Sequence, residues 1–335
     1  MISVCIPAWN VEKTIAATVQ SVLNQSLDDF EILVVDDRGS DDSIAIVKDL
    51  QNKPQGDKIR IVQHDVNRSL GTVRNTCIEN AFGDYIFFLD GDDLLKPNCL
   101  QVLLHEIETD EYDFVAGSVE CRYDDQSIAQ ELETFNNYRL NQLILNTHND
   151  IVNYALIQGG VYIPVWNKLY RRSFLVDNRI RAIDGIFTED EFFSFQVFLK
   201  SNKCKLIERI TYTHYKRRTK NTNRTREHCI KKMQDYIIIT HMEREYLREF
   251  EKDPLYWAIA WRLVLLHKGE FAKRLQSQEY KKYVPVSVIR FLKRNPIPYR
   301  QRIQYLTKYL YFLNKYVQSC LFPDKYRIVI PRINP

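Results

Sequence analysis

The segment "IFFLDGDDLL" places three carboxylates, those of Asp90, Asp92 and Asp93, directly after an apolar run. Two carboxylates about 5 Å apart repel each other by roughly 3 kcal/mol at an effective dielectric constant near 20. One interpretation is a solvated turn in which Asp93 caps the helix that follows. The other is a site for a hard divalent cation, because such an ion converts the repulsion into attraction. Three acids after one buried strand favour the cation site.

The elements that must position these acids follow from the hydrophobic pattern. Short runs rich in apolar residues predict four strands, at residues 1–7, 30–37, 59–65 and 84–93, and the first, second and fourth are expected to be buried. Apolar residues at helical spacing predict three helices between them, at residues 10–26, 40–53 and 71–81. Strands and helices that alternate at short intervals are typical of a parallel α/β sheet.

Polar residues recur where each predicted strand ends. The four carboxyl ends read "PAWN", "DDRGSDD", "HDVNRS" and "DGDD" in chain order. Ligands of open α/β sheets lie beyond the carboxyl ends of the strands. We therefore expect these polar residues to form one site at one edge of the sheet.

The alternation weakens after the fourth strand. We expect a strand at 113–123, helix and loop at 124–149, further elements at 165–175 and 183–200, and long amphipathic helices from residue 226 onward. This pattern predicts a catalytic domain at 1–225 and a helical region at 226–335. The last 65 residues carry 14 Lys and Arg against two Asp and Glu, whereas the first 270 carry 33 against 41. This asymmetry predicts two different kinds of partner.

Composition excludes several classes of protein. The 335 residues include only 10 glycines, and no glycine-rich phosphate-binding motif occurs. The seven cysteines are widely scattered with no C-x-x-C pair, which favours reduced thiols in the cytoplasm over disulfides or a zinc site. We expect no signal peptide and no transmembrane helix, because the first residues lack a basic segment and no apolar run approaches about 18 residues.

The order of these motifs resembles a known family. "PAWN", "EILVVDD", "RN", "FLDGDD", "WNKLYR" and "TEDE" occur in the order found in GT-A glycosyltransferases of family 2. The resemblance covers about residues 1–220. It implies a GT-A fold, with a Rossmann-like, mainly parallel sheet flanked by helices, followed here by a C-terminal α-helical region. It also implies an inverting enzyme that uses a nucleotide sugar and a divalent metal ion.

The resemblance assigns roles to individual residues. It implies that Asp92 binds the metal ion and that Asp190 is the catalytic base, although Asp190 could instead cap the helix after it. His214 is a further candidate metal ligand, with a structural histidine as the alternative. The residues implied to bind the nucleotide sugar are Pro7, Ala8, Asn10, Asp37, Arg74 and Asp90.

Four residues are candidates for the acceptor side: Trp166, Asn167, Lys168 and Glu189. Plain packing is the alternative for the first three of them. Arg217, Arg218 and Lys220 could hold a diphosphate or form a solvated loop. The chain departs from the usual motifs at Arg38, where a small residue is common, and at Trp9, where tyrosine is frequent.

The implied chemistry predicts cofactor and partners. Mn²⁺ or Mg²⁺ suits carboxylate and phosphate oxygens. The donor would be a nucleotide sugar, with a UDP-sugar as our expectation, and the acceptor a hydroxyl of a glycan or glycolipid. A metal-dependent phosphotransferase or nucleotidyltransferase acting on sugar phosphates is the alternative. The acidic first 270 residues argue against a nucleic-acid partner.

The basic C-terminal region predicts a membrane partner. Its apolar residues between 305 and 317 fall at helical spacing, and lysines flank them. Packing on the catalytic domain explains the stripe, but only attraction to anionic lipid also explains the missing acids. We expect a cytoplasmic protein held at the inner face of the cell membrane, acting in bacterial lipooligosaccharide or capsule synthesis.

Overall fold

The structure is a computed structural model that describes residues 1–123, 138–216, 226–256, 258–260 and 263. The chain divides into two units, residues 1–219 and 220–335, and each is described by itself. The domain boundary expected after residue 225 stays a prediction.

The first half of unit 1 is a parallel sheet built from the predicted strands. The strands are β1 (Ile2–Ala8), β2 (Phe30–Asp36), β3 (Ile59–Gln63) and β4 (Tyr85–Phe88). The helices that connect them are α1 (Ile15–Leu23), α2 (Ser43–Gln51) and α3 (Leu70–Asn80). Every residue of β2 and β4 is buried, as expected for strands that helices cover on both faces.

The second half adds antiparallel strands. After β5 (Leu94–Leu95) and α4 (Cys99–Glu108), the strands are β6 (Phe114–Tyr123), β7 (Leu143–Leu145), β8 (Lys168–Arg171) and β9 (Cys204–Lys216). The helices are α6 (His148–Ile151), the π-helix η2 (Val152–Ile157), α7 (Arg172–Asp177) and α8 (Asp190–Lys200). Of the segment predicted at 183–200, only the part from Asp190 onward is helix.

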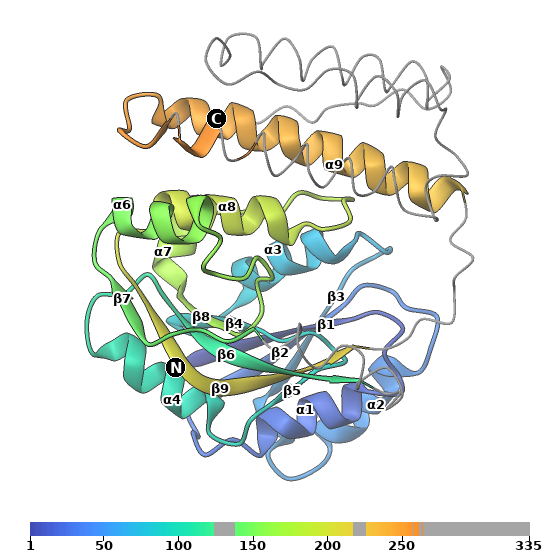
Figure 1. Ribbon diagram of the computed structural model, residues 1–335. Helices are drawn as coiled ribbons and strands as arrows, with labels where there is room; N and C mark the ends of the chain where they lie inside the picture. The colour runs from blue at the N-terminus through green and yellow to red at the C-terminus, as the bar shows by residue number, and fades with distance from the viewer. Residues whose placement is uncertain (124–137, 217–225, 257, 261–262, 264–335) are drawn as a thin grey trace. The chain divides into compact units, whose positions relative to one another are not determined.

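All these strands join one mixed sheet. Its order is β3-β2-β1-β4-β8-β6-β9-β5, with β7 paired to β9. β8 runs antiparallel to β4 and β6, whereas β6 and β9 are parallel. In Figure 1, α1, α2 and α4 cover one face of the sheet, and α3, α7 and α8 cover the other. The predicted class, a largely parallel sheet flanked by helices, is confirmed.

The described part of unit 2 is helical. It contains α9 (Arg226–Leu247) and the short 3-10 helix η3 (Arg248–Phe250). None of the helices among the described residues has both the length and the apolar character needed to cross a membrane. The stripe at 305–317 lies outside the described residues.

One local interpretation was wrong. Asp93 does not cap a helix, because Leu94 and Leu95 form β5 against β9, and α4 begins only at Cys99 after Asn98. The Asp93 side chain is fully buried instead.

Candidate functional site

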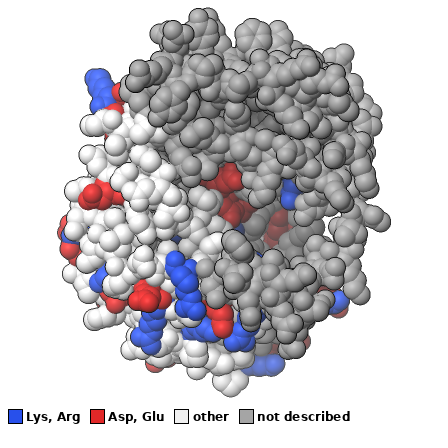
Figure 2. Space-filling view, in the orientation of Figure 1, with Lys and Arg blue, Asp and Glu red and all other residues white. Residues whose placement is uncertain are grey.

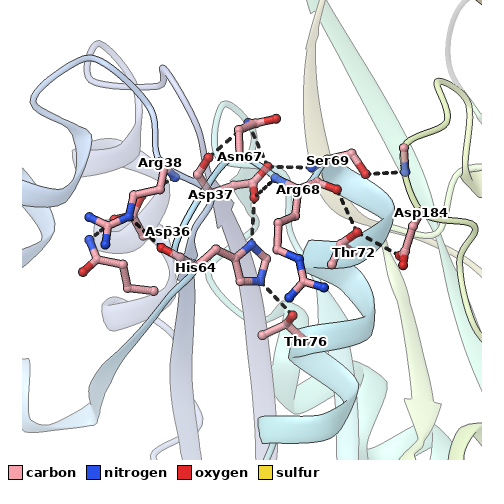
Figure 3. Close-up of polar contacts among 12 residues, drawn as sticks. Asp36, Asp37, Arg38, His64, Asn67, Arg68, Ser69, Thr72, Thr76 and Asp184 are labelled. Atoms are coloured by element: carbon pink, nitrogen blue, oxygen red, sulfur yellow. Dashed lines mark hydrogen bonds and ion pairs between the residues drawn. The ribbon is translucent and has the colours of Figure 1, made fainter.

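Asp37 holds the loop that follows β3. Its Oδ1 accepts hydrogen bonds from the backbone N–H of Arg68 (2.8 Å) and from Nδ1 of His64 (2.8 Å). Its Oδ2 accepts from Nδ2 of Asn67 (3.0 Å) and from the N–H of Ser69 (3.0 Å). Figure 3 shows these donors converging on one carboxylate. Because both oxygens are occupied, Asp37 shapes this edge of the sheet, and its predicted contact with the nucleoside stays a prediction.

The loop after β1 is tied to the loop after β2. Asn10 accepts a hydrogen bond at Oδ1 from the N–H of Ser40 (2.8 Å), and the carbonyl of Ala8 accepts from the N–H of Asp37 (3.1 Å). Pro7 is half-buried and Asn10 exposed. Two of the predicted donor-binding segments therefore lie side by side. Trp9 between them is 54% exposed and offers an aromatic face.

The acidic turn, residues 90–93, packs against the start of α1. The carbonyl of Gly91 accepts hydrogen bonds from Oγ1 of Thr14 (2.9 Å) and Oγ1 of Thr18 (3.1 Å). A Cβ on Gly91 would lie 2.7 Å from the carbonyl oxygen of Pro7. Glycine at this position therefore allows the turn to approach β1 closely, which holds Asp92 at the sheet edge.

Asp93 binds His214. Its carboxylate accepts hydrogen bonds from Nδ1 of His214 (2.9 Å), from the hydroxyl of Tyr212 (2.8 Å) and from the N–H of Tyr215 (2.8 Å). Burial lowers the pKa of His214, but the hydrogen bond and charge of Asp93 and the nearby acids outweigh it, so the pKa is raised overall. Because Nδ1 is held by Asp93, Nε2 is the ring nitrogen left to face a ligand.

Arg74 connects the acidic turn to the segment that leads into α8. Its buried guanidinium donates from Nε to Oε1 of Glu189 (3.0 Å) and from Nη2 to Oδ1 of Asp90 (3.3 Å). Burial raises the pKa of Asp90 to about 6, with Arg74 opposing and Asp93, Asp190 and Asp92 adding to the rise. Asp190, the first residue of α8, is thus close enough to act electrostatically on the turn.

The pKa of Glu189 is raised further above its ordinary value than the pKa of Asp90. Its side chain is 4% exposed. Burial raises the pKa of Glu189 to about 8, the charge of Asp190 adds to the rise, and Arg74 opposes it. Perturbed carboxylates gathered at one place are typical of functional sites. On the face seen in Figure 2, acidic side chains gather near the middle of the picture.

The three candidate acceptor residues of "WNK" are buried. Trp166 stacks on Tyr212 (ring centroids 5.0 Å apart) and on His214 (5.2 Å). Asn167 donates from Nδ2 to the carbonyl of Gly117 (2.8 Å), and Lys168 donates from Nζ to the backbone carbonyls of Tyr162 and Pro164 in the segment before β8. Their side chains have little or no exposure. Packing, the alternative left open by the sequence, is favoured for all three.

Several non-glycine residues of the segments described above have left-handed backbone, as do Gln55 and Arg179 elsewhere. Asn10, Arg38, Ser69, Asn167 and Thr188 have φ between 54° and 84°. Such conformations cost on the order of 1–3 kcal/mol each and concentrate at functional sites. Thr188 stands out, because a β-branched residue rarely adopts this conformation and because Glu189 and Asp190 follow it.

The donor set fits a divalent cation that is completed by a substrate. Across the described part of the chain, no three His, Cys, Asp or Glu side chains stand close enough together to hold a metal ion alone. Asp92 would supply a carboxylate oxygen, which suits Mn²⁺ or Mg²⁺, and His214 would add a nitrogen, Nε2. Phosphate oxygens and water would supply the rest. Arg217, Arg218 and Lys220 lie outside the described residues.

Sequence motifs assign no individual role to His64 or Asn75. Asp93, the third acid after β4, is interpreted from the sequence either as a helix cap or as part of the cation site. His64 follows β3, and the Nδ1 contact with Asp37 could not be inferred from spacing. Asn75 stands in the quoted motif "RN", next to Arg74.

Comparison with known sequences identifies the family. Residues 3–176, more than half of the chain, match the profile described as Glycosyl transferase family 2. The chain therefore belongs to glycosyl transferase family 2.

Several curated proteins are similar to this chain. A cholesterol galactosyltransferase of Borreliella burgdorferi is 29% identical over 219 residues, which is 64% of this chain and 60% of that protein. The UDP-Glc:alpha-D-GlcNAc-diphosphoundecaprenol beta-1,3-glucosyltransferase WfgD of Escherichia coli is 27% identical over 215 residues, or 62% of this chain and 83% of that protein. The aligned region thus spans 60% of the length of the Borreliella protein.

Solved structures support the fold. The crystal structure of S. aureus TarS 1-349 matches with a TM-score of 0.60 at 19% identity, covering 95% of this chain and 80% of that chain. The same TarS fragment in complex with UDP-GlcNAc matches with a TM-score of 0.55 at 17% identity, covering 100% and 98%. At these identities the likeness establishes the architecture.

Proposed function

We propose that this chain is an inverting glycosyltransferase that moves a sugar from a UDP-sugar to a hydroxyl group of a glycan or glycolipid. The observation that carries the proposal is the buried Arg74 bridge, with its contacts of 3.3 Å to Asp90 and 3.0 Å to Glu189. The bridge brings a donor-side acid and the segment of the proposed base, Asp190, to one guanidinium. Sugar transfer requires the donor-side acid and the proposed base to act at the same bond of the donor.

Each residue of the proposed site has its own role in sugar transfer. In an inverting reaction, the acceptor hydroxyl attacks the anomeric carbon opposite the leaving diphosphate, and a base takes its proton. Asp190 is the proposed base, and Asp90 contacts the ribose. Asp92 and His214 would hold Mn²⁺ or Mg²⁺, and the bound ion would neutralise charge on the leaving diphosphate.

The remaining predicted donor residues surround the nucleoside in this proposal. Pro7, Ala8 and Asn10 border it, and Asp37 acts on it directly or through the loop at 67–69. Glu189, held by Arg74, lies on the acceptor side next to Asp190.

The acceptor in this proposal is carried by a lipid. Two relatives support it, since one is named for a sterol acceptor and the other for a UDP-Glc donor and a diphosphoundecaprenol-linked acceptor. The excess of basic residues after 270 supports contact with anionic membrane at the cytoplasmic face. A product in bacterial lipooligosaccharide or capsule synthesis agrees with such an acceptor.

The test uses a panel of UDP-sugars with Mn²⁺ and measures UDP release and UDP binding. Asp190→Asn should bind UDP with Mn²⁺ as the wild type does, and its UDP release should fall by about 100-fold or more, because proton transfer is lost. Glu191→Gln, an acid in the same turn of α8, is the matched control and should stay active. Unchanged kcat in Asp190→Asn with weakened UDP binding would overturn the base assignment. Phosphate transfer without sugar transfer would favour the phosphotransferase alternative.

A further inference from the structure

Residues 182–185 dock on the first turns of α3, and we call this contact the α3 seam. The hydroxyl of Thr72 donates to Oδ1 of Asp184 (2.8 Å), and Oγ of Ser69 accepts from the N–H of Gly185 (2.8 Å). Figure 3 shows the side chain of Asp184 reaching the helix beside Thr72. The seam therefore extends from the loop shaped by Asp37 to the segment that leads into Asp190.

Asn75 is the centre of the seam. Its Oδ1 accepts from the N–H of Ala182 (2.9 Å), and its Nδ2 donates to the carbonyl of Ala182 (3.0 Å). Nδ2 also lies 3.3 Å from Oδ1 of Asp184. One side-chain amide thus satisfies both backbone groups of Ala182, as a neighbouring strand would.

Gly71 lets the two segments come together. A Cβ at this position would lie 2.3 Å from the carbonyl oxygen of Ile183, and backbone cannot yield as a flexible side chain can. The close approach therefore depends on a missing side chain on the helix.

The seam and the Arg74 bridge hold the same segment at two points. Asn75 binds residue 182, and its neighbour Arg74 binds Glu189, next to Asp190. Thr188, between these points, has a φ of 64°, which the chain adopts only where its surroundings impose it. Two consecutive residues of α3 therefore fix both ends of the short segment before α8.

We propose that Asn75 is a positioning residue, which sets the proposed base Asp190 against the donor site through the α3 seam. This inference rests on the proposed function for the role of Asp190. Asn75 lies at the seam and has no assigned contact with donor or cation, so its loss should slow the chemical step without weakening donor binding. A displacement of about 1 Å in a base can cost on the order of 100-fold in rate.

The experiment compares Asn75→Ala and Gly71→Ala with wild type in the full chain. Gly71→Ala removes no hydrogen-bonding group and favours the helix itself, so it opens the seam by steric pressure alone. Asn80→Ala is the matched control, because Asn80 lies on the same helix, is also half-buried, and its side-chain amide donates within the helix, to the carbonyl of Thr76 (2.9 Å). Circular dichroism establishes that each variant is folded.

Three quantities are measured on each variant. We expect hydrogen exchange of the Ala182 amide to rise about 10-fold or more in Asn75→Ala, since its acceptor is lost. We expect UDP release from the best UDP-sugar of the panel to fall at least about 10-fold in both seam variants, and the Kd of UDP with Mn²⁺ to stay within about twofold. Asn80→Ala should change none of them.

Distinct results would overturn distinct claims. Faster exchange at Ala182 with unchanged UDP release would overturn the positioning role of Asn75 alone, as would unchanged exchange. Weakened UDP binding in step with UDP release would assign Asn75 to the donor site instead. An active Asp190→Asn variant would overturn the base assignment together with this role.

Discussion

Glu189 is the acid of the candidate site with the most strongly raised pKa. It is buried beside Asp190, and Arg74 is the cation that contacts it. A carboxyl group in this position binds a proton more tightly in the folded chain than in the unfolded one. The position therefore links folding stability to pH.

Glu189→Gln should change how stability depends on pH. The pKa of Glu189 is raised from 4.5 to about 8, so the unfolded chain releases this proton first as pH rises. Its contribution to stability is fully present below about pH 4.5 and is lost as pH rises through about 8. The glutamine variant lacks this decline, so we expect its free energy of unfolding to change less with pH between about 4.5 and 8 than that of the wild type. Urea unfolding at several pH values measures it, and parallel curves would contradict the prediction.

Asp92→Ala should abolish the metal-dependent activity. The Asp92 carboxylate is the proposed oxygen ligand, so its loss should reduce Mn²⁺-dependent UDP release by about 100-fold or more with little change in melting temperature. Titration of Mn²⁺ in the presence of UDP is the measurement. Wild type in excess chelator should behave as the variant does, and full activity in either case would exclude the metal assignment.

At the scale of elements, the acidic turn depends on how closely it packs against β1 and α1. Gly91→Ala should push the turn away from the carbonyl of Pro7, which lies 2.7 Å from the position of the new Cβ. Overpacking of this kind costs about 1–3 kcal/mol, so the melting temperature should fall and Mn²⁺ affinity should weaken with it. Thermal unfolding and Mn²⁺ titration test this pair of effects. A variant that loses neither would show that the turn can shift freely.

Strands β1, β2 and β4 could be predicted from the sequence because each is a short, mainly apolar run between polar segments. A strand buried on both faces needs this pattern, and "EILVVD" and "YIFF" have it without interruption. The same logic located Asp90, Asp92 and Asn10 at the ends of strands. Local sequence suffices where burial alone determines the element.

The second half could not be predicted in this way because long-range pairing determines it. β9 brings His214 next to Asp93, across 121 residues of chain, and no local signal marks that contact. The "WNK" residues are polar or aromatic, yet tertiary hydrogen bonds and ring stacking bury them. Arg74 and Glu189 likewise meet only in the fold.

At the scale of the whole molecule, the main feature is the asymmetry of charge between the first 270 residues and the last 65. We expect the full chain to sediment with vesicles that contain anionic lipid, because 14 basic residues after 270 face only two acids. Added salt should release it, and neutral vesicles should not bind it. A chain truncated after residue 263 is the control. Equal recovery in the supernatant with both vesicle types at low salt would leave packing as the explanation of the apolar stripe.

The α3 seam has a consequence for diversification. Asn75 and Gly71 contact backbone atoms of residues 182 and 183, which every amino acid except proline offers. Residues 182 and 183 can therefore change their side chains and still dock on α3, provided that Asp184 and Glu189 remain for Thr72 and Arg74. Sequence variation in this segment is then expected to concentrate at 182, 183 and 186–187, between the positions that hold it.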